Sequence, residues 1–462
     1  MSSPIADYLT QHRGENFALH EKFLNTQMVR VLKTIGYDRI YTRASGPYLY
    51  DAEGNEYLDL LSGFGVFALG RNHPKVIAAL MDVLQAELPD MVQMDVSLLS
   101  GLLAERLLRL CPTNLSKVFF CNSGAEAVEA AIKFARYTTR REKILYCEHG
   151  FHGLTMGALS LNGENVFREG FGPLLPQCLA VPFNDPAALD QALRARDVAA
   201  FVVEPIQGKG VNLPSPDYLP EASRLCRQYG TLFVADEIQT GLGRTGKFWA
   251  IDHWGVEPDM ILMAKALSGG FIPVGAVAMT SQVMEAVFNR MDRAVVHGST
   301  FSKNNMAMAA GLAALQVIED EKLVENAARM GDELLQGLQT LVDRYELFRV
   351  ARGKGLMIAL EFGSPTSFSL KAAWNLLETA NKGLFSQMIT IPLFKNHHIL
   401  SQVAGHGMNV VKFLPPLVIG ERDRDWVIGA LDQVIADCHK IPGAIWDLGK
   451  TLTGHALKAK AG

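Results

Sequence analysis

The sequence predicts an α/β protein with a large domain built on a mainly parallel sheet and a smaller α+β domain. Short apolar runs alternate with helical patterns between about residues 72 and 310, which is typical of a parallel sheet covered by helices. A long helical run around residues 320–344 then leads into a region with further strand-like segments. The chain of 462 residues is also long enough for more than one core.

We expect three parts along the chain: an N-terminal segment at 1–70 that joins the small domain, a large domain at 71–330, and a C-terminal small domain at 331–462. One face of an early helix is expected to pack on the body of the protein, and the alternative is a helix lying on a membrane surface. The residues of that face are Leu24, Met28, Val31 and Ile35. Tyr48–Leu61 predicts a hairpin with its turn at Glu53–Asn55.

Strand and helix patterns then follow in order. Strands are predicted at Lys117–Cys121, Lys143–Cys147, Ala200–Val203, Leu232–Ala235 and Met260–Met263, and helices at Ala125–Thr139 and Leu219–Tyr229. In the smaller domain, Arg352–Phe362 and Asn409–Ile419 are predicted as strands. The long apolar segment Trp374–Leu400 is expected to form core, with an apolar rim around a substrate site as the alternative.

Composition excludes several classes of protein. Hydrophobic residues make up 48% and charged residues 20%, which is ordinary for a globular protein. A net charge of −4 provides no basic field for nucleic acid. The six cysteines are scattered without a CxxC pair, which favours free thiols in a reducing compartment and argues against a zinc site. Since we find neither an apolar leader core nor a membrane-spanning run, we expect a cytoplasmic protein.

One glycine-rich stretch imitates a nucleotide-binding loop. Gly241–Lys247 nearly matches GxxxxGK, but Phe248 stands where a Ser or Thr would reach magnesium. The sequence behind it is also too short and broken for the helix that such a loop requires. We therefore predict a surface loop, and a nucleotide-binding protein remains the alternative from another class.

Polar groups that follow three of the predicted strands are expected to meet in one crevice. Ser123, Gly124 and Ala125 open a helix, whose free N–H groups form an anion site. Asp236 ends an apolar strand, where a carboxylate needs a cation. Lys265 follows another apolar strand, and burial there would make its amine a nucleophile. Ligands of parallel sheets collect at such carboxyl ends of strands.

Each group alone also has a purely structural explanation, such as a capped helix or a lysine that extends to solvent. Together, an anion site, a buried carboxylate and a nucleophilic amine match one small molecule, pyridoxal 5'-phosphate, which has a phosphate, a basic ring nitrogen and an aldehyde. On this interpretation, the cation that Asp236 meets is the protonated pyridine nitrogen.

The sequence resembles the class III aminotransferases, the fold-type I pyridoxal phosphate enzymes that include ornithine, acetylornithine, putrescine and ω-amine transaminases. The resemblance extends from about Tyr48 to Gly420 and includes the sequence around Lys265. Its motifs are NSGAEA at Asn122–Ala127, FHG at Phe151–Gly153, EPIQG at Glu204–Gly208, DEIQTGLGRTG at Asp236–Gly246 and HGSTF at His297–Phe301.

The resemblance implies roles for the residues already singled out. Lys265 is expected to hold the cofactor as a Schiff base and, once displaced, to move a proton between the substrate carbon and the cofactor carbon. Asp236 is expected to pair with the ring nitrogen. Ser123, Gly124 and Ala125 are expected to bind the phosphate.

Further positions are implied by the resemblance alone. Phe151 is expected to stack on the cofactor ring and Ile238 to form the apolar wall behind it, with Gln239 near the ring hydroxyl. Glu204 resembles a glutamate that fixes the neighbouring polar network. Thr300 is expected to bind the phosphate of the other subunit, which implies a homodimer with shared sites.

Departures from the family pattern bear on the substrate. Leu154 stands where many members have a carboxylate-binding arginine, and Phe64 and Phe67 stand where ornithine-type enzymes have a tyrosine and small residues. The glutamate and arginine that form a gate in those enzymes are replaced by Lys209 and Lys412, which cannot pair with each other. We expect Lys412, together with Lys209, to bind glutamate or 2-oxoglutarate.

The sequence therefore predicts a pyridoxal phosphate-dependent aminotransferase that works in two half-reactions. A donor such as glutamate leaves its amine on the cofactor, and a carbonyl substrate that is neutral or apolar takes it, a bulky lipid-like aldehyde such as a hopanoid side chain among the candidates. The alternatives are an ornithine-, acetylornithine- or putrescine-type aminotransferase, and a decarboxylase, racemase or aminomutase on the same cofactor scaffold.

Overall fold

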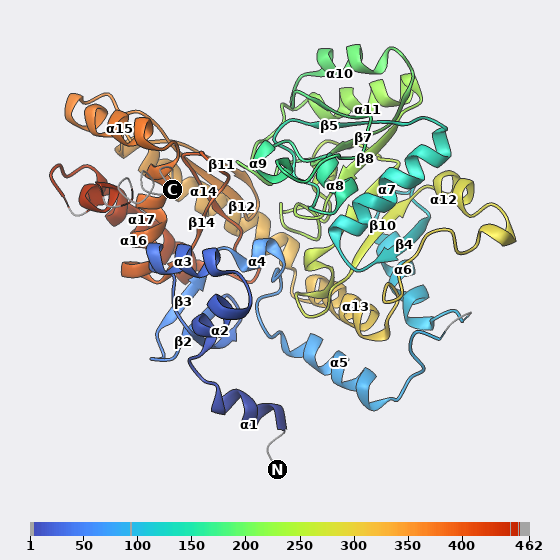
Figure 1. Ribbon diagram of the computed structural model, residues 1–462, viewed down its shortest axis with the longest axis horizontal. Helices are drawn as coiled ribbons and strands as arrows, with labels where there is room; N and C mark the ends of the chain where they lie inside the picture. Colours follow the sequence, from blue (N-terminus) through green and yellow to red (C-terminus); the bar gives the residue numbers. More distant parts are fainter. Residues whose placement is uncertain (1–3, 93–94, 444, 451, 453–462) are drawn as a thin grey trace.

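The protein has two masses in the computed structural model, which describes residues 4–92, 95–443, 445–450 and 452. One mass surrounds the large sheet, and the other contains two four-stranded sheets with the N-terminal and C-terminal helices (Figure 1). The fold class is the predicted one, mixed α/β with a large, mostly parallel sheet. The predicted boundary at residue 330 falls inside a long helix, and the division into domains stays a prediction.

The large sheet has seven strands in the order β4-β10-β9-β8-β7-β5-β6. Only β10 runs antiparallel to its neighbours, and the remaining pairs are parallel. The central strands are buried along their whole length, as expected of parallel strands covered on both faces. The bounds are β4 (Lys117–Cys121), β5 (Lys143–Cys147), β6 (Cys178–Val181), β7 (Val198–Val203), β8 (Leu232–Asp236), β9 (Met260–Met263) and β10 (Gly275–Met279).

Helices cover both faces of this sheet (Figure 1). The longest on one face, α7, begins at Gly124 because the Ser123 side chain caps it, and it ends at Thr139. The others are α5 (Pro74–Gln85), α6 (Leu98–Leu110), α8 (Met156–Ser160), α9 (Asn165–Arg168), α10 (Pro186–Leu193), α11 (Tyr218–Tyr229), α12 (Ser281–Val287) and α13 (Asn305–Asp320), with 3₁₀ turns η1 (Ala250–His253), η2 (Lys265–Ser268) and η3 (Met291–Arg293).

The second mass contains two small sheets. One has the order β1-β2-β3-β13 and includes the predicted hairpin; the other has the order β11-β12-β15-β14. Their strands are β1 (Tyr41–Ser45), β2 (Tyr48–Asp51), β3 (Glu56–Asp59), β11 (Phe348–Lys354), β12 (Met357–Phe362), β13 (Ile399–Leu400), β14 (Gln402–Val403) and β15 (Val410–Phe413). The helices are α1 (Pro4–Gln11), α2 (Asn16–Phe23), α3 (Thr26–Ile35), α4 (Ser62–Gly65), α14 (Leu323–Arg344), α15 (Phe368–Ala380), α16 (Leu384–His397) and α17 (Glu421–Cys438).

Two strand predictions in this mass were wrong in extent. Arg352–Phe362 is not one strand, because Gly355, at a φ of +51°, turns the chain between β11 and β12. The strand predicted over Asn409–Ile419 ends at Phe413, since the two prolines that follow lack the N–H that a ladder needs.

The early helix faces the other way from the prediction. In α3 the buried residue is Val29, while Leu24, Met28 and Val31 of the predicted packing face are exposed. Of that face, Ile35 packs against the core. The helical period was correct, but period alone does not say which neighbour a short amphipathic helix meets.

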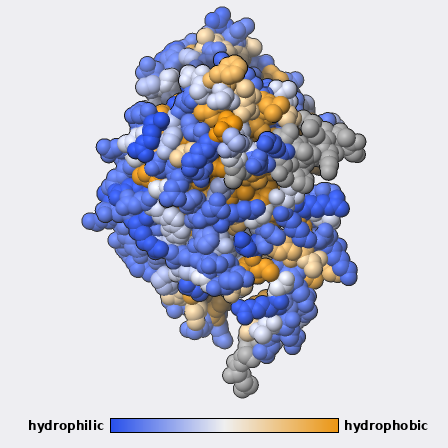
Figure 2. Space-filling model, turned by 90° about the vertical axis from the view of Figure 1, so that its left-hand side faces the viewer, coloured by the Kyte–Doolittle hydropathy of each residue, from blue (hydrophilic) through white to orange (hydrophobic). Residues whose placement is uncertain are grey.

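The apolar segment Trp374–Leu400 forms core. It folds into parts of α15 and α16, and all α16 residues from Leu384 to Phe394 except Gln387 are buried. None of its residues lines the large cavity described below. The side of the molecule that carries α15 and α17 in Figure 1 faces the viewer in Figure 2 and is largely hydrophilic, with scattered hydrophobic patches. The alternative of an apolar substrate rim built by this segment is therefore not supported.

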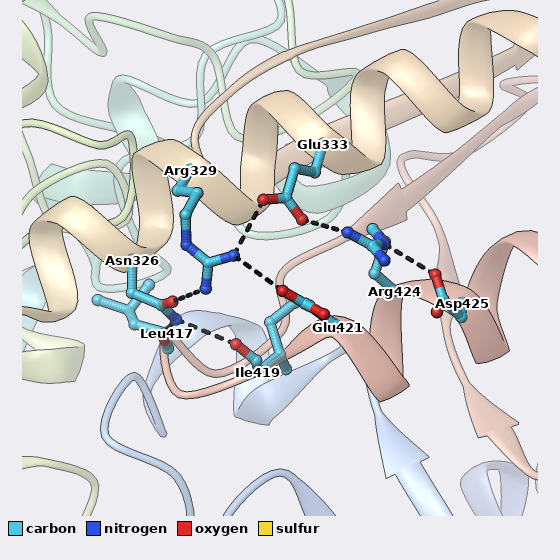
Figure 3. A network of polar contacts seen from close by, with 8 residues as sticks. All are labelled: Asn326, Arg329, Glu333, Leu417, Ile419, Glu421, Arg424 and Asp425. Atoms are coloured by element: carbon cyan, nitrogen blue, oxygen red, sulfur yellow. Dashed lines mark hydrogen bonds and ion pairs between the residues drawn. The ribbon is translucent and has the colours of Figure 1, made fainter.

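A polar network fastens α14 to the chain that leaves β15 (Figure 3). Asn326 donates through Nδ2 to the carbonyls of Leu417 and Ile419, at 2.7 and 3.0 Å. Arg329 and Arg424 both pair with Glu333, which ties α14 to α17. The segment that follows the strand bearing Lys412 is thus anchored to α14.

The buried Arg244 side chain also holds the chain just after β15. The Arg244 guanidinium donates to the carbonyls of Leu356 and Pro415, and burial lowers its pKa to about 9. The Leu356 N–H donates in return to the Arg244 carbonyl at 2.9 Å. The loop after β8 is therefore bound to the second small sheet. Within the described ranges, no helix has the length and apolar character needed to cross a membrane.

Candidate active site

A cavity of about 810 Å³ lies at the carboxyl ends of β4, β8 and β9 and is closed by the segment 402–412 of the second small sheet. The topology brings together residues that are far apart in sequence, because parallel strands end at the same edge. Its lining contains most of the predicted site residues: Phe64, Ser123, Gly124, Ala125, Phe151, Leu154, Glu204, Lys209, Asp236, Ile238, Gln239, Lys265 and Lys412.

The first turn of α7 borders the cavity at the predicted anion site. Ser123 is the N-cap, and its Oγ accepts from the Glu126 N–H at 3.2 Å. A Cβ on Gly124 would lie 3.0 Å from the Ile238 side chain, so glycine permits the close approach of these two walls. The Gly124 and Ala125 N–H groups, like those of any first helical turn, lack an intrahelical acceptor, and both residues line the cavity.

Asp236 is held by a histidine that sequence reasoning missed. His152 donates from Nδ1 to Asp236 Oδ2 at 2.6 Å, and the Ile238 N–H donates to Oδ1 at 3.1 Å. Both side chains are buried. Burial opposes a charged His152, but the bond to Asp236 prevails and raises the pKa of His152. The available signal was the position of His152 directly after Phe151 in the FHG motif.

Lys265 occupies an unusual backbone conformation at the start of η2. Its φ of 45° lies in the left-handed region, which non-glycine residues rarely adopt and which concentrates at functional sites. Desolvation lowers the pKa of its amine, while Asp236 and Glu204 partly offset that effect. A lysine with a lowered pKa has more of the neutral amine that attacks an aldehyde.

Glu204 organises the backbone around the cavity without a cation partner in the described part of the chain. Its carboxylate accepts from the N–H of Phe151 at 2.9 Å and of Gly208 at 2.7 Å. Burial raises its pKa, and His152 opposes the rise. A Cβ on Gly208 would lie 2.6 Å from Gln239 Oε1, so a larger residue here would displace the Gln239 side chain. Glu204 thereby holds both the Phe151 segment and the turn that follows β7.

Lys412 is a buried cation surrounded by dipoles. Its Nζ donates to the Gly208 carbonyl at 2.8 Å and to Gln239 Oε1 at 3.3 Å, and no described carboxylate forms an ion pair with it. Gln239 in turn donates to the Phe64 carbonyl at 3.1 Å. Desolvation, reinforced by the charge of Lys265, lowers the pKa of Lys412 to about 7.

Lys209 has a different environment on the same cavity. Its Nζ lies 3.0 Å from Glu164 Oε2, and the ammonium lies over the rings of Phe167 and Phe151, 4.0 and 5.3 Å from their centroids. Burial lowers its pKa, and Glu164 opposes the shift. Sequence reasoning missed both Glu164 and Phe167.

One part of the lining, around Phe64 and Leu154, is apolar. Phe64 lies on a tight left-handed turn, with φ of 44° at Ser62, 62° at Gly63 and 61° at Phe64. Leu154 is 57% exposed and presents no charge to the cavity. Val66, Phe271 and Ile272 extend the same surface. This wall offers apolar contact and no carboxylate-binding side chain.

Two predicted site residues lie outside the cavity lining. Phe67 packs against the Arg71 guanidinium, 4.0 Å from the ring centroid, and beside Gly270. Thr300 is exposed in the loop after η3. A role for Thr300 toward another subunit is not tested by a single chain, and both roles stay predictions.

The glycine-rich stretch Gly241–Lys247 does not form a phosphate-binding loop. The 3₁₀ turn η1 follows it in place of the helix that such a loop needs, and its Arg244 is buried against the second small sheet. None of its residues lines the large cavity. The predicted surface location was also wrong, because residues 241–245 are buried. The nucleotide-binding alternative is therefore wrong for this site.

The chemistry of the cavity fits pyridoxal phosphate. Lys265 offers a desolvated amine for an aldehyde, Asp236 offers a buried acid for a basic ring nitrogen, and the first turn of α7 offers N–H groups for a phosphate. In the described part of the chain, no group of three or more His, Cys, Asp or Glu side chains could hold a metal ion.

Known proteins resemble the chain over most of its length. Aminotransferase PigE of Serratia sp. is 36% identical over 454 residues, covering 91% of this chain and 53% of PigE, so the chain spans about half of that relative. A putrescine aminotransferase of Pectobacterium atrosepticum is 44% identical over 337 residues, 71% of each chain. The solved ornithine aminotransferase of Toxoplasma gondii, with partial occupancy of PLP at its active site, has a TM-score of 0.79 at 31% identity, covering 94% of this chain and 98% of that one.

The model of the class-III aminotransferase family matches residues 33–435, a span that contains every residue of the cavity. The motifs, the fold and the cofactor chemistry of the cavity agree with that match. This chain belongs to the class III aminotransferases, which depend on pyridoxal phosphate.

Proposed function

We propose that this aminotransferase moves an amino group from an acidic donor such as glutamate to a carbonyl substrate that is neutral or apolar next to its reacting carbon. The observation that carries the proposal is the asymmetry of the cavity. Lys412 is a buried cation without a carboxylate partner in the described ranges, and the wall formed by Phe64, Val66 and Leu154 is apolar.

Lys412 is suited to a carboxylate because its present partners are weak. A carbonyl and an amide satisfy part of its hydrogen-bonding capacity but do not neutralise its charge. A substrate carboxylate in this desolvated position would form charge-assisted hydrogen bonds, which are stronger than neutral ones. Leu154 and Phe64 have neither a positive charge nor a hydrogen-bond donor for a second substrate carboxylate, so they favour a neutral or apolar group.

The residues divide the chemistry among them. Bound pyridoxal phosphate supplies an aldehyde carbon that accepts the amino group and a ring that takes up the electron pair left on the substrate carbon. Lys265 would hold the cofactor through its amine and, once displaced by a substrate amine, would carry the proton that leaves the substrate carbon. Asp236, oriented by His152, would keep the ring nitrogen protonated. Ser123, Gly124 and Ala125 would hold the phosphate.

The proposal includes a homodimer in the cytoplasm. Thr300 lies outside the cavity and is exposed, as expected of a residue that would reach the phosphate of the other subunit. The N-terminal helices also expose large apolar side chains that a second copy could cover, among them Ile5, Leu9 and Phe23. All six cysteines are free, which agrees with a reducing compartment.

A panel of substrates tests the specificity. Holoenzyme is mixed with single amino donors, and the change of the cofactor absorbance is followed in one half-reaction. We expect glutamate and neutral monoamines to convert the cofactor, and ornithine and putrescine to react more slowly than the best neutral amine. Ornithine turning over as well as that amine would contradict the proposal. Release of carbon dioxide or racemisation of a single substrate would point to the alternative reactions.

A further inference from the structure

Lys209 is a buried cation with an acid behind it. The residue is 9% exposed and lines the cavity, while Glu164, whose Oε2 lies 3.0 Å from Nζ, is not part of the lining. The rings of Phe167 and Phe151, over which the ammonium lies, also line the cavity, so the ion pair borders it. The ion pair lies just before α9, beside Phe167.

The ion pair leaves Lys209 incompletely satisfied. The contact to Glu164 is not aligned as a hydrogen bond, and Nζ has no other hydrogen-bond partner among the described residues. A lysine ammonium has three donors, and two aromatic rings occupy part of its remaining surroundings. Donors of Lys209 thus remain without an acceptor among the described residues, beside two rings of the cavity lining.

Glu164 has no alternative cation in the described part of the chain. Its carboxylate forms an ion pair with Lys209, and its side chain is 14% exposed. Removal of Lys209 would leave a largely buried acid, and removal of Glu164 would leave a largely buried cation facing the cavity. Each partner is therefore the counter-ion of the other.

We propose that Glu164 is a specificity-determining residue that competes with the distal carboxylate of a dicarboxylic substrate for Lys209. This inference rests on the proposed function, in which Lys412 receives one carboxylate. With a neutral substrate, Lys209 keeps Glu164 and the cavity wall stays neutral. With a dicarboxylic substrate, Lys209 shares or exchanges its partner, and Glu164 weakens the binding of that substrate.

The test measures binding of two unreactive acids to the holoenzyme by titration calorimetry. Glutarate has two carboxylates and butyrate has one. In Glu164→Gln we expect glutarate to bind about tenfold more tightly than in the wild type, because the competing acid is gone, while butyrate changes little. The KM for 2-oxoglutarate should fall in parallel, and the KM for a neutral aldehyde should not fall.

Two further variants guard the interpretation. Asp197→Asn removes an ion pair outside the cavity, in which Lys143 Nζ lies 2.7 Å from Asp197 Oδ2. This control variant should leave the ratio of the glutarate and butyrate affinities unchanged. Glu164→Gln combined with Lys209→Met should lose the tenfold gain, because the gain requires the free ammonium. An unchanged or weaker glutarate affinity in Glu164→Gln, with the cofactor absorbance intact, would overturn the inference.

The outcomes separate this inference from the proposed function. The ratio of the two acid affinities is read without turnover, so it reports on Lys209 and Glu164 even if every proposed amine fails to react. Conversely, a wild type that transaminates glutamate and neutral amines while Glu164→Gln leaves the ratio unchanged upholds the proposed function and rejects the competition.

Discussion

The two lysines Lys209 and Lys412 both line the cavity but have different surroundings. Lys209 has Glu164 at 3.0 Å and two phenylalanine rings. Lys412 has a carbonyl and an amide oxygen, with other lysines nearby. Burial lowers the pKa of both, and for Lys412 the value falls to about 7.

The difference shows that the partners of a buried lysine determine how much charge it presents to the cavity. Lys209 and Glu164 together form a nearly neutral part of the wall. The charge of Lys412 is not neutralised, because its partners are neutral dipoles. The second arrangement costs stability in the free enzyme and is offset when a substrate carboxylate binds. Buried groups with strongly shifted pKa values concentrate at functional sites for this reason.

The largest expected effect comes from a third lysine, Lys265, because the proposed reaction requires it with acidic and neutral substrates alike. Lys265→Ala should reduce the single-turnover rate by at least about a thousandfold, because the covalent anchor and the proton carrier are lost together. Borohydride reduction of wild-type holoenzyme followed by mass spectrometry should place the cofactor on the peptide that contains Lys265. Attachment to another peptide would contradict the assignment.

The next effect concerns Lys412 itself. Lys412→Met should raise the KM for an acidic donor by about tenfold to a hundredfold, since the partner of the substrate carboxylate is removed. The KM for a neutral amine should change little. Lys143→Met, which removes a lysine outside the cavity, serves as the control. Equal losses for acidic and neutral substrates would show that Lys412 does not discriminate between them.

The pH dependence sharpens the comparison further. Because the pKa of Lys412 is about 7, its ammonium is present below that pH and disappears above it. The value of kcat/KM for an acidic donor should therefore decline as the pH rises through about 7 to 8, relative to the value for a neutral amine. In Lys412→Met this relative decline should be absent. A ratio that stays flat in the wild type would exclude a titrating Lys412.

Stability provides an independent measurement on the same residue. The folded-state pKa of Lys412 lies below its unfolded value of 10.5, so its charge costs folding free energy below pH 7, and the cost shrinks as the pH rises. The unfolding free energy of Lys412→Met relative to wild type should thus fall by about 2 to 3 kcal/mol between pH 6 and pH 9. Denaturant titrations at the two pH values check the difference, and a constant difference would refute it.

The smallest effect is expected in the network of Figure 3. The Arg329 side chain is 51% exposed and pairs with Glu333 at 2.9 Å. Arg329→Gln should change the unfolding free energy by no more than about 0.5 kcal/mol, because exposed ion pairs are screened by solvent. Chemical denaturation measures this, and a loss of several kcal/mol would mean that the network behaves like a buried one.

Local patterns allowed much of the fold to be predicted. β4, β5 and β9 have the predicted bounds, since short apolar runs between turn residues leave few alternatives. The cluster of Ser123, Asp236 and Lys265 followed from the rule that parallel strands end at one edge. Errors arose where a glycine or proline divided a segment, as at Gly355, or where a helix met an unforeseen neighbour, as in α3.

Pairings across the fold could not be predicted from the sequence. Nothing near Glu164 in the chain indicates Lys209, and nothing near Asp236 indicates a bond to His152, because these contacts depend on how distant loops fold together. The carboxylates of Asp236 and Glu237, although adjacent in sequence, also have different hydrogen-bond partners. Glu237 accepts from Thr240 and the Ile251 N–H at 2.5 and 2.7 Å, and burial raises its pKa to about 7.

The buried Arg244 limits how this scaffold can be recombined. Its bonds to Leu356 and Pro415 mean that the loop after Asp236 and the strand of Lys412 were shaped as a matched set. A chimera that imports residues 399–420 from a relative, in order to transplant a donor preference, should also import 241–247 and the β11–β12 turn. A graft that exchanges only one of these segments would lose the Arg244 bonds and shift Lys412 relative to Asp236.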